Sequence, residues 1–73
     1  MRDWNAYAKG VLRAEMTRRQ ISYADLVRLL AEAQVKETEV NLRNKVSRGS
    51  FTAAFLFQCL AAMKVTNLHL SEA

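Results

Sequence analysis

The side chains best suited to chemistry gather in one short stretch, residues 41–49, with the sequence NLRNKVSRG. If this stretch is helical, Leu42 and Val46 share the side that faces the core, so Asn44 points outward. Amide side chains can form paired hydrogen bonds with adenine, and arginine can do so with guanine. No acidic residue occurs between residues 40 and 71. The stretch therefore favours a face that reads base edges in double-stranded DNA, with an ordinary solvated helix surface as the alternative.

Some of the other side chains of this helix would contact bases in the DNA groove, and others would contact the DNA backbone. Val40 is the one apolar residue on the outer side and could touch a thymine methyl group. Arg43 and Lys45 fall on the flanks, where cations would reach phosphates, and phosphate contacts position a protein without reading sequence. Arg48 could serve the groove, or it could simply interact favourably with the C-terminal end of the helix dipole. The sequence leaves both roles open.

Other kinds of site have little support in the sequence. His69 is the single histidine and Cys59 the single cysteine, and both lie among apolar residues, which favours packing over catalysis. They cannot supply the three or four ligands of a zinc site without several carboxylates. Glu37 and Glu39 are two residues apart and would diverge on a helix, and no glycine-rich phosphate loop occurs. We therefore expect no enzyme, no metal, no cofactor and no small-molecule substrate.

The chain is short and basic, which limits what it can be. Its 73 residues fit a single domain, residues 1–73, with a small core. The formal net charge of +4 favours an anionic partner. No proline and two glycines occur, which favours helices with short connections over a β-sandwich or barrel. A lone cysteine, no signal-peptide pattern and no run of about 20 apolar residues predict a cytoplasmic protein without a membrane partner.

Hydrophobic periodicity and capping residues predict four helices. The expected N-caps are Asp3, Ser22, Thr38 and Thr52. Ser22 and Asp25 resemble a capping box, and Gly49 suits the left-handed position after the third helix. The expected spans are residues 3–19, 22–33, 39–48 and 53–63, with the cap residue included in the first two. The end of the chain, residues 65–73, is ambiguous, because it could complete the core either as a fifth, short helix or as an extended segment.

The same periodicity predicts which side chains are buried. The expected inward residues are Trp4, Ala8, Val11, Leu12 and Met16 in the first helix, Leu26, Leu29, Leu30 and Ala33 in the second, and Phe55, Leu56, Cys59, Leu60 and Met63 in the fourth. Val35, between the second and third helices, is expected to point inward. Trp4 and Tyr7 are then core or edge aromatics and not a platform on which bases stack.

Three stretches follow one another in an order that carries a family resemblance. They are RQISYADL at the start of the second helix, VSRG at the end of the third, and FLFQCLAAMKV in the fourth. Together they resemble the lambda-repressor-like helix-turn-helix domains of the Cro/repressor type. That resemblance implies an all-α domain of four or five helices that binds double-stranded DNA, with the third helix in the major groove. It also implies a bacterial transcriptional regulator. The chain is similar, through WNAYAKGVLRAEM, NLRNKVSRG and FLFQCLAAMKV, to a family of small bacterial proteins of unknown function as well.

The lambda-repressor-like resemblance also implies which residues contact DNA. Ser22 and Tyr23, at the start of the second helix, would bind phosphate. The residues assigned to the groove are Asn41, Asn44, Lys45 and Arg48, with Arg43 and Lys36 nearby. Gln20 and Gln34 stand where that family usually has a small residue and a glycine. The run between residues 26 and 49 is also about two helical turns longer than a compact domain needs, so we expect a longer connection between the second and third helices.

The fourth helix is apolar nearly all round, which raises the question of a partner. Helix-turn-helix proteins commonly pair to read two half-sites, and Phe57, Leu68 and Leu70 would then form a homodimer interface. The alternative is burial of these residues within the domain. A competing function is a helical protein-interaction module, antitoxin-like or an adaptor. Such a module would use the fourth helix and the C-terminal segment on a protein partner and would not bind DNA by itself.

Overall fold

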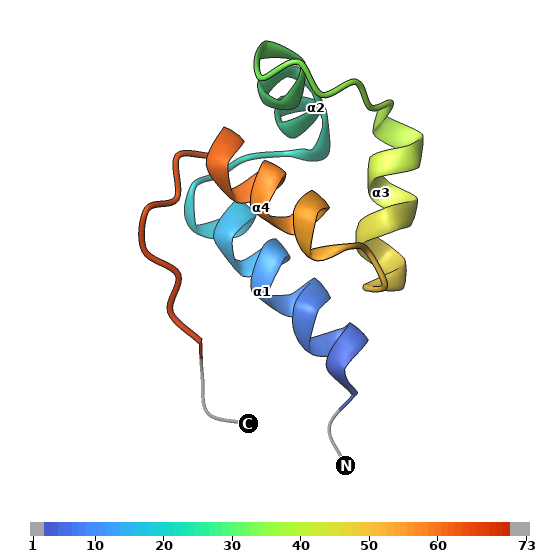
Figure 1. Cartoon of the computed structure of the whole chain (residues 1–73), viewed down its shortest axis with the longest axis vertical. Helices are drawn as coiled ribbons and strands as arrows, with labels where there is room; N and C mark the ends of the chain where they lie inside the picture. The colour runs from blue at the N-terminus through green and yellow to red at the C-terminus, as the bar shows by residue number, and fades with distance from the viewer. Residues whose placement is uncertain (1–2, 71–73) are drawn as a thin grey trace.

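Four helices joined by short connections make up the molecule (Figure 1). The computed structural model describes residues 3–70, and within them it contains no strand. The helices are α1 (Trp4–Arg18), α2 (Tyr23–Glu32), α3 (Glu39–Arg48) and α4 (Ala53–Ala62). The all-α prediction is confirmed, and the predicted spans agree closely with these bounds. Residues 65–70 form an irregular segment, so the described part of the chain has no fifth helix, and the end of the ambiguous stretch lies outside the described residues.

Each helix begins at the N-cap that the sequence predicted. The caps are Asp3, Ser22, Thr38 and Thr52, and each side chain accepts a hydrogen bond from a backbone amide of the first turn. At α2 the bonding is reciprocal, because the Ser22 amide donates to Asp25 and the Asp25 amide donates to Ser22 Oγ, both at 3.0 Å. The bond from the Ser22 amide is the main cause that lowers the pKa of Asp25. Such a cap contributes about 1 kcal/mol and fixes where its helix starts.

Three of the helices end in the same hydrogen-bonded turn, although none of the three has glycine there. The left-handed residues are Gln20 (φ 55°), Gln34 (φ 69°) and Lys64 (φ 61°). The next amide reaches back five residues, from Ile21 to Met16, from Val35 to Leu30, and from Val65 to Leu60, each at 2.9 Å. The aliphatic residue that follows each left-handed position packs against the core, as predicted for Val35. A residue other than glycine costs about 1–2 kcal/mol in the left-handed conformation. Burial of the aliphatic residue that follows it offsets this cost and keeps each turn in place.

The turn after α3 does require glycine. Gly49 has a φ of 70°, as predicted, and a Cβ atom there would lie 2.1 Å from the backbone oxygen of Asn5 in α1. Close by, the ammonium group of Lys9 donates to the carbonyl of Ser47 at 3.2 Å. The C-terminal end of α3 is therefore seated directly on the first turns of α1. Gly10, by contrast, has open space where its side chain would be, so packing requires no glycine at that position.

All four helices contribute to the core. α1 packs against α3 and α4, and α2 packs against the same two helices. The buried hydrophobic residues are Leu12, Met16, Leu26, Leu30, Leu42, Val46, Phe55, Cys59, Leu60 and Met63. Two inward predictions are wrong, because Trp4 is 60% exposed and Ala33 is exposed. Trp4 lies in the first turn of α1, which extends past the other helices in Figure 1, and Ala33 follows the last residue of α2.

One charged side chain is buried in α1, which the sequence did not predict. Glu15 is 2% exposed, and its carboxylate is bound by the guanidinium groups of Arg18 and Arg19. We call these three residues the Glu15 cluster. Glu15 and Arg18 line a surface hollow on α1, and His69 of the C-terminal segment lines the same hollow. In Figure 1 that segment and α3 lie on opposite sides of α1.

Candidate nucleic-acid interface

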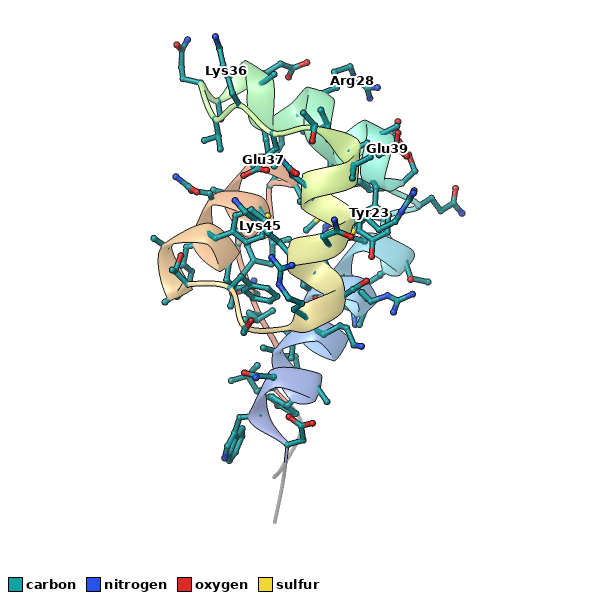
Figure 2. All side chains as sticks on the ribbon, turned by 90° about the vertical axis from the view of Figure 1, so that its right-hand side faces the viewer. Tyr23, Arg28, Lys36, Glu37, Glu39 and Lys45 are labelled. Atoms are coloured by element: carbon teal, nitrogen blue, oxygen red, sulfur yellow. The ribbon has the colours of Figure 1, made fainter. Side chains whose placement is uncertain are left out.

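α3 lies at the surface, and Figure 2 looks onto it, with Lys45 on one side of the helix and Glu39 on the other. Leu42 and Val46 are fully buried, as predicted, and they fix the rotation of the helix. The outward residues, which are all exposed, are Val40, Asn41, Asn44, Ser47 and Arg48. We call this set the outer face of α3. It has no acidic member, and the apolar Val40 is 65% exposed within it.

One flank of the outer face is formed by Arg43. Its guanidinium group donates to Glu39 at 3.0 Å and lies 5.2 Å from the centre of the Tyr23 ring. Tyr23 is half-buried and packs against the core, so α2 fixes the position of its ring. Both members of the Arg43–Glu39 pair are about half exposed. Such a surface ion pair is weak, so Arg43 can exchange Glu39 for another anion at little cost in free energy. Arg43 thus neutralises the one acid of α3 and can still reach a phosphate.

The opposite flank is formed by Lys45, which is engaged more firmly. Its ammonium group pairs with Glu37 at 2.5 Å and lies 4.9 Å from the centre of the Phe55 ring. Figure 2 shows Lys45 and Glu37 on one side of α3, with Tyr23 and Glu39 on the other. The Glu37 side chain is only 10% exposed, so removing its partner would leave a nearly buried carboxylate unpaired. Lys45 therefore has a structural pairing, and its predicted contact with DNA stays a prediction.

Two of the predicted cations are not engaged in this way. Among residues 3–70, no hydrogen bond or ion pair involves the side chain of Arg48 or Lys36. Lys36 lies in the α2–α3 connection and lines a shallow hollow together with Asn41. Arg13 of α1 is likewise exposed and unpaired within the described residues, and it was not among the residues predicted to contact DNA. Arg13 follows Lys9 by four residues, about one helical turn, and Lys9 contacts α3. This spacing could have placed Arg13 on the side of α1 that faces α3.

A groove borders each flank of α3, and another helix begins in each groove. The first, of about 270 Å³, is lined by Arg13, Met16, Thr17, Ile21, Ser22, Tyr23, Glu39 and Arg43 at the start of α2. The second, of about 230 Å³, is lined by Lys45, Arg48, Ser50, Phe51, Thr52 and Phe55 at the start of α4. The unbonded amides of a helix start and its dipole both favour anions. The first groove brings together the predicted phosphate contacts Ser22, Tyr23 and Arg43, and the second adds Ser50, which was not predicted.

The connection between α2 and α3 is longer than a standard helix-turn-helix turn. It spans residues 33–38, whereas the usual turn has about 3–4 residues. Gln34 terminates α2, Val35 is fastened to Leu30, and Thr38 begins α3. The expected departure from the compact turn is confirmed.

One protein-family model matches nearly the whole chain, including all four helices. A family model described as a domain of unknown function, DUF6471, matches residues 4–68, from the start of α1 into the C-terminal segment. The chain belongs to this family. No curated protein and no solved structure matches the chain. The predicted membership of a family of unknown function is thus confirmed, and the lambda-repressor-like class of the fold stays a prediction.

The DUF6471 domain exposes only some of the residues predicted for a dimer interface. Phe57 of α4 is 63% exposed and Leu70 of the C-terminal segment is 56% exposed. Leu68 is half-buried and packs against the core, so it has a role within one chain. A homodimer through Phe57 and Leu70 stays a prediction.

The DUF6471 domain also shows why its cysteine is a packing residue. Cys59 is fully buried, and burial, with the nearby Glu37 carboxylate adding to it, raises the pKa of the thiol to about 12. Within the part of the chain that the structure describes, no group of three or more His, Cys, Asp or Glu side chains could hold a metal. No helix of that part is long and apolar enough to cross a membrane.

Proposed function

We propose that this domain binds double-stranded DNA with α3 in the major groove. The observation that carries the proposal is the outer face of α3, where amide, hydroxyl and guanidinium side chains are exposed without an acidic residue. Asn41 and Asn44 can pair with adenine, and Arg48 can pair with guanine. A sequence-reading domain of this kind would serve a bacterial transcriptional regulator, the role that the lambda-repressor-like resemblance implies.

The two grooves beside α3 support the same orientation. A helix lying in the major groove has one DNA backbone on each side, and phosphate contacts on both sides would hold it in register. The groove at the start of α2 offers Arg13, Arg43 and the Ser22 hydroxyl. The groove at the start of α4 offers Arg48 and Ser50. These contacts are few, so binding to random sequence should be weak and should weaken further as salt rises.

Titration of labelled mixed-sequence duplex DNA, followed by fluorescence anisotropy at low and physiological salt, tests the proposal. The Arg48→Gln substitution should weaken binding severalfold. Lys64→Gln is the matched control, because it also removes one exposed cation that has no partner within residues 3–70, but it follows α4 and is not part of the outer face of α3. Circular dichroism establishes that both variants are folded. Equal loss in the two variants, or no binding by the folded wild-type domain at low salt, would contradict the proposal.

A second candidate is a protein-interaction module, and the exposed Phe57 favours it. α4 carries no charged residue, and Phe57 is 63% exposed on it. A module of this kind would be sensitive to Phe57→Ser and indifferent to Asn44→Ala, whereas a DNA-binding domain would show the reverse pattern. Measuring both variants against duplex DNA and against a candidate protein partner separates the two functions.

A further inference from the structure

Three residues of the outer face form a gently winding row along α3. Val40, Asn44 and Arg48 are spaced four residues apart, so each lies about one turn after the last on the same face, rotated by about 40° around the axis. A helix rises 1.5 Å per residue, which places successive members about 6 Å apart along the axis. All three are exposed, and Asn44 lies directly opposite the buried Leu42 and Val46. The row is therefore the part of α3 that would enter a groove most deeply.

The members of the row differ in what they can recognise. A branched aliphatic side chain such as Val40 finds an apolar partner in the major groove in the thymine methyl group. The amide of Asn44 matches the N6 and N7 atoms of adenine, and the guanidinium of Arg48 matches the O6 and N7 atoms of guanine. Each match is between a side chain and a different base, so the row has a direction.

The neighbouring cations do not disturb this order, because other contacts hold them. Arg43 pairs with Glu39 and stacks on Tyr23, and Lys45 pairs with Glu37 beside Phe55. Both lie on the flanks, where the backbone phosphates would be. Base selection is thereby left to the outer face.

We infer that α3 selects a DNA core in which thymine, adenine and guanine contacts occur in that order along the groove, facing Val40, Asn44 and Arg48. Base pairs are about 3.4 Å apart, so contacts about 6 Å apart fall on roughly every second base pair. The core then spans about five base pairs. This inference rests on the proposed function and adds to it the chemical class and order of the bases.

The test is selection of binding sequences from a random duplex library with the full 73-residue chain and with three single variants. Val40→Ala should relax the thymine preference at one end of the motif, Asn44→Ala the adenine in the middle, and Arg48→Ala the guanine at the other end. Each favoured base should lose about tenfold in selectivity. Arg48→Gln should replace guanine by adenine at that same end, because glutamine pairs with adenine.

The outcomes separate the inference from the function beneath it. A motif in which the variants act at different positions in the order stated supports both. A motif with other bases, or one in which every variant weakens all positions equally, overturns the ordered row while leaving DNA binding in place. Failure of the folded wild-type chain to enrich any sequence, together with no binding to mixed duplex at low salt, overturns both. Circular dichroism of each variant excludes unfolding as the cause.

Discussion

The Glu15 cluster and the outer face of α3 both carry arginine side chains, and they differ in whether an acid already pairs with the guanidinium charge. In the Glu15 cluster, two guanidinium groups bind one carboxylate that is almost fully buried. On the outer face of α3, Arg48 has no such partner within residues 3–70. The Glu15 cluster keeps one net positive charge, but a buried carboxylate holds both of its guanidinium groups. Arg48 is held by no acid within residues 3–70, so its whole charge is open to an anionic ligand. The formal net charge of +4 therefore says that an anion is a plausible partner, and the pairing of individual side chains says where it would bind.

The largest expected effect comes from disrupting the contact between the C-terminal end of α3 and the first turns of α1. Gly49→Ala should lower the free energy of unfolding by about 3 kcal/mol, since the new Cβ adds left-handed strain and collides with the Asn5 carbonyl. Urea unfolding followed by circular dichroism measures the loss. Gly10→Ala is the matched control and should stabilise the domain by about 1 kcal/mol, because that glycine is helical and has open space around it. Similar behaviour of the two variants would contradict the packing described for Gly49.

The role of the Glu15 cluster can be tested by removing its charge. Glu15→Gln should destabilise the domain by about 1–2 kcal/mol, because charge-assisted hydrogen bonds in a mostly buried setting are lost. DNA affinity should rise only as much as it does in Glu32→Gln, an exposed acid whose replacement makes the same change in net charge. Chemical denaturation and anisotropy give the two quantities. A specific loss of DNA affinity in Glu15→Gln would place the Glu15 cluster in the binding surface, together with the outer face of α3.

The α2–α3 connection should tolerate a substitution at Gln34, which lies outside both the Glu15 cluster and the outer face of α3. Gln34→Gly should stabilise the domain by about 0.5–1 kcal/mol, since glycine relieves the left-handed strain at φ 69° but adds freedom to the unfolded chain. DNA affinity should not change, because Gln34 lies outside the outer face of α3. A lower midpoint of thermal unfolding in this variant would show that the Gln34 side chain makes a larger contribution than its backbone strain.

The smallest expected effect concerns the cap beside the first groove. The pKa of Asp25 is lowered from its ordinary value of 3.8 in the folded state, chiefly by the hydrogen bond from the Ser22 amide. Its stabilising contribution is therefore fully present above pH 3.8 and is lost as the pH falls through the lower folded-state pKa. The stability of the wild-type domain should fall more steeply with acidification below that pH than the stability of Asp25→Asn. Parallel slopes for the two proteins would show that the cap is not coupled to pH.

The helices could be predicted because local residues define them. Much of the interface could not, because it depends on how separate parts of the chain pack together. Thr38 marks the start of α3 through its side-chain hydroxyl, which accepts from the Asn41 amide, and Gly49 marks the end through its left-handed backbone. Leu42 and Val46 set the rotation of the helix by their spacing alone. The pairing of Lys45 with Glu37 and Phe55, and of Arg43 with Tyr23, depends on how separate helices pack, which no local pattern encodes. The exposure of Trp4 has the same origin, since periodicity marks a face of α1 but not where the neighbouring helices stop covering it.

We propose that α3 and the helix starts beside it form one DNA-binding surface. Backbone amide shifts of the isotope-labelled domain, recorded by NMR as mixed-sequence duplex is added at low salt, report which residues the DNA contacts. The shift changes should be concentrated at residues 40–48 and at the starts of α2 and α4, and the amides of Arg18, Arg19 and Phe57 should be unaffected. Changes centred on the Glu15 cluster or on the exposed side of α4, or no changes at all in the folded domain, would contradict this proposal.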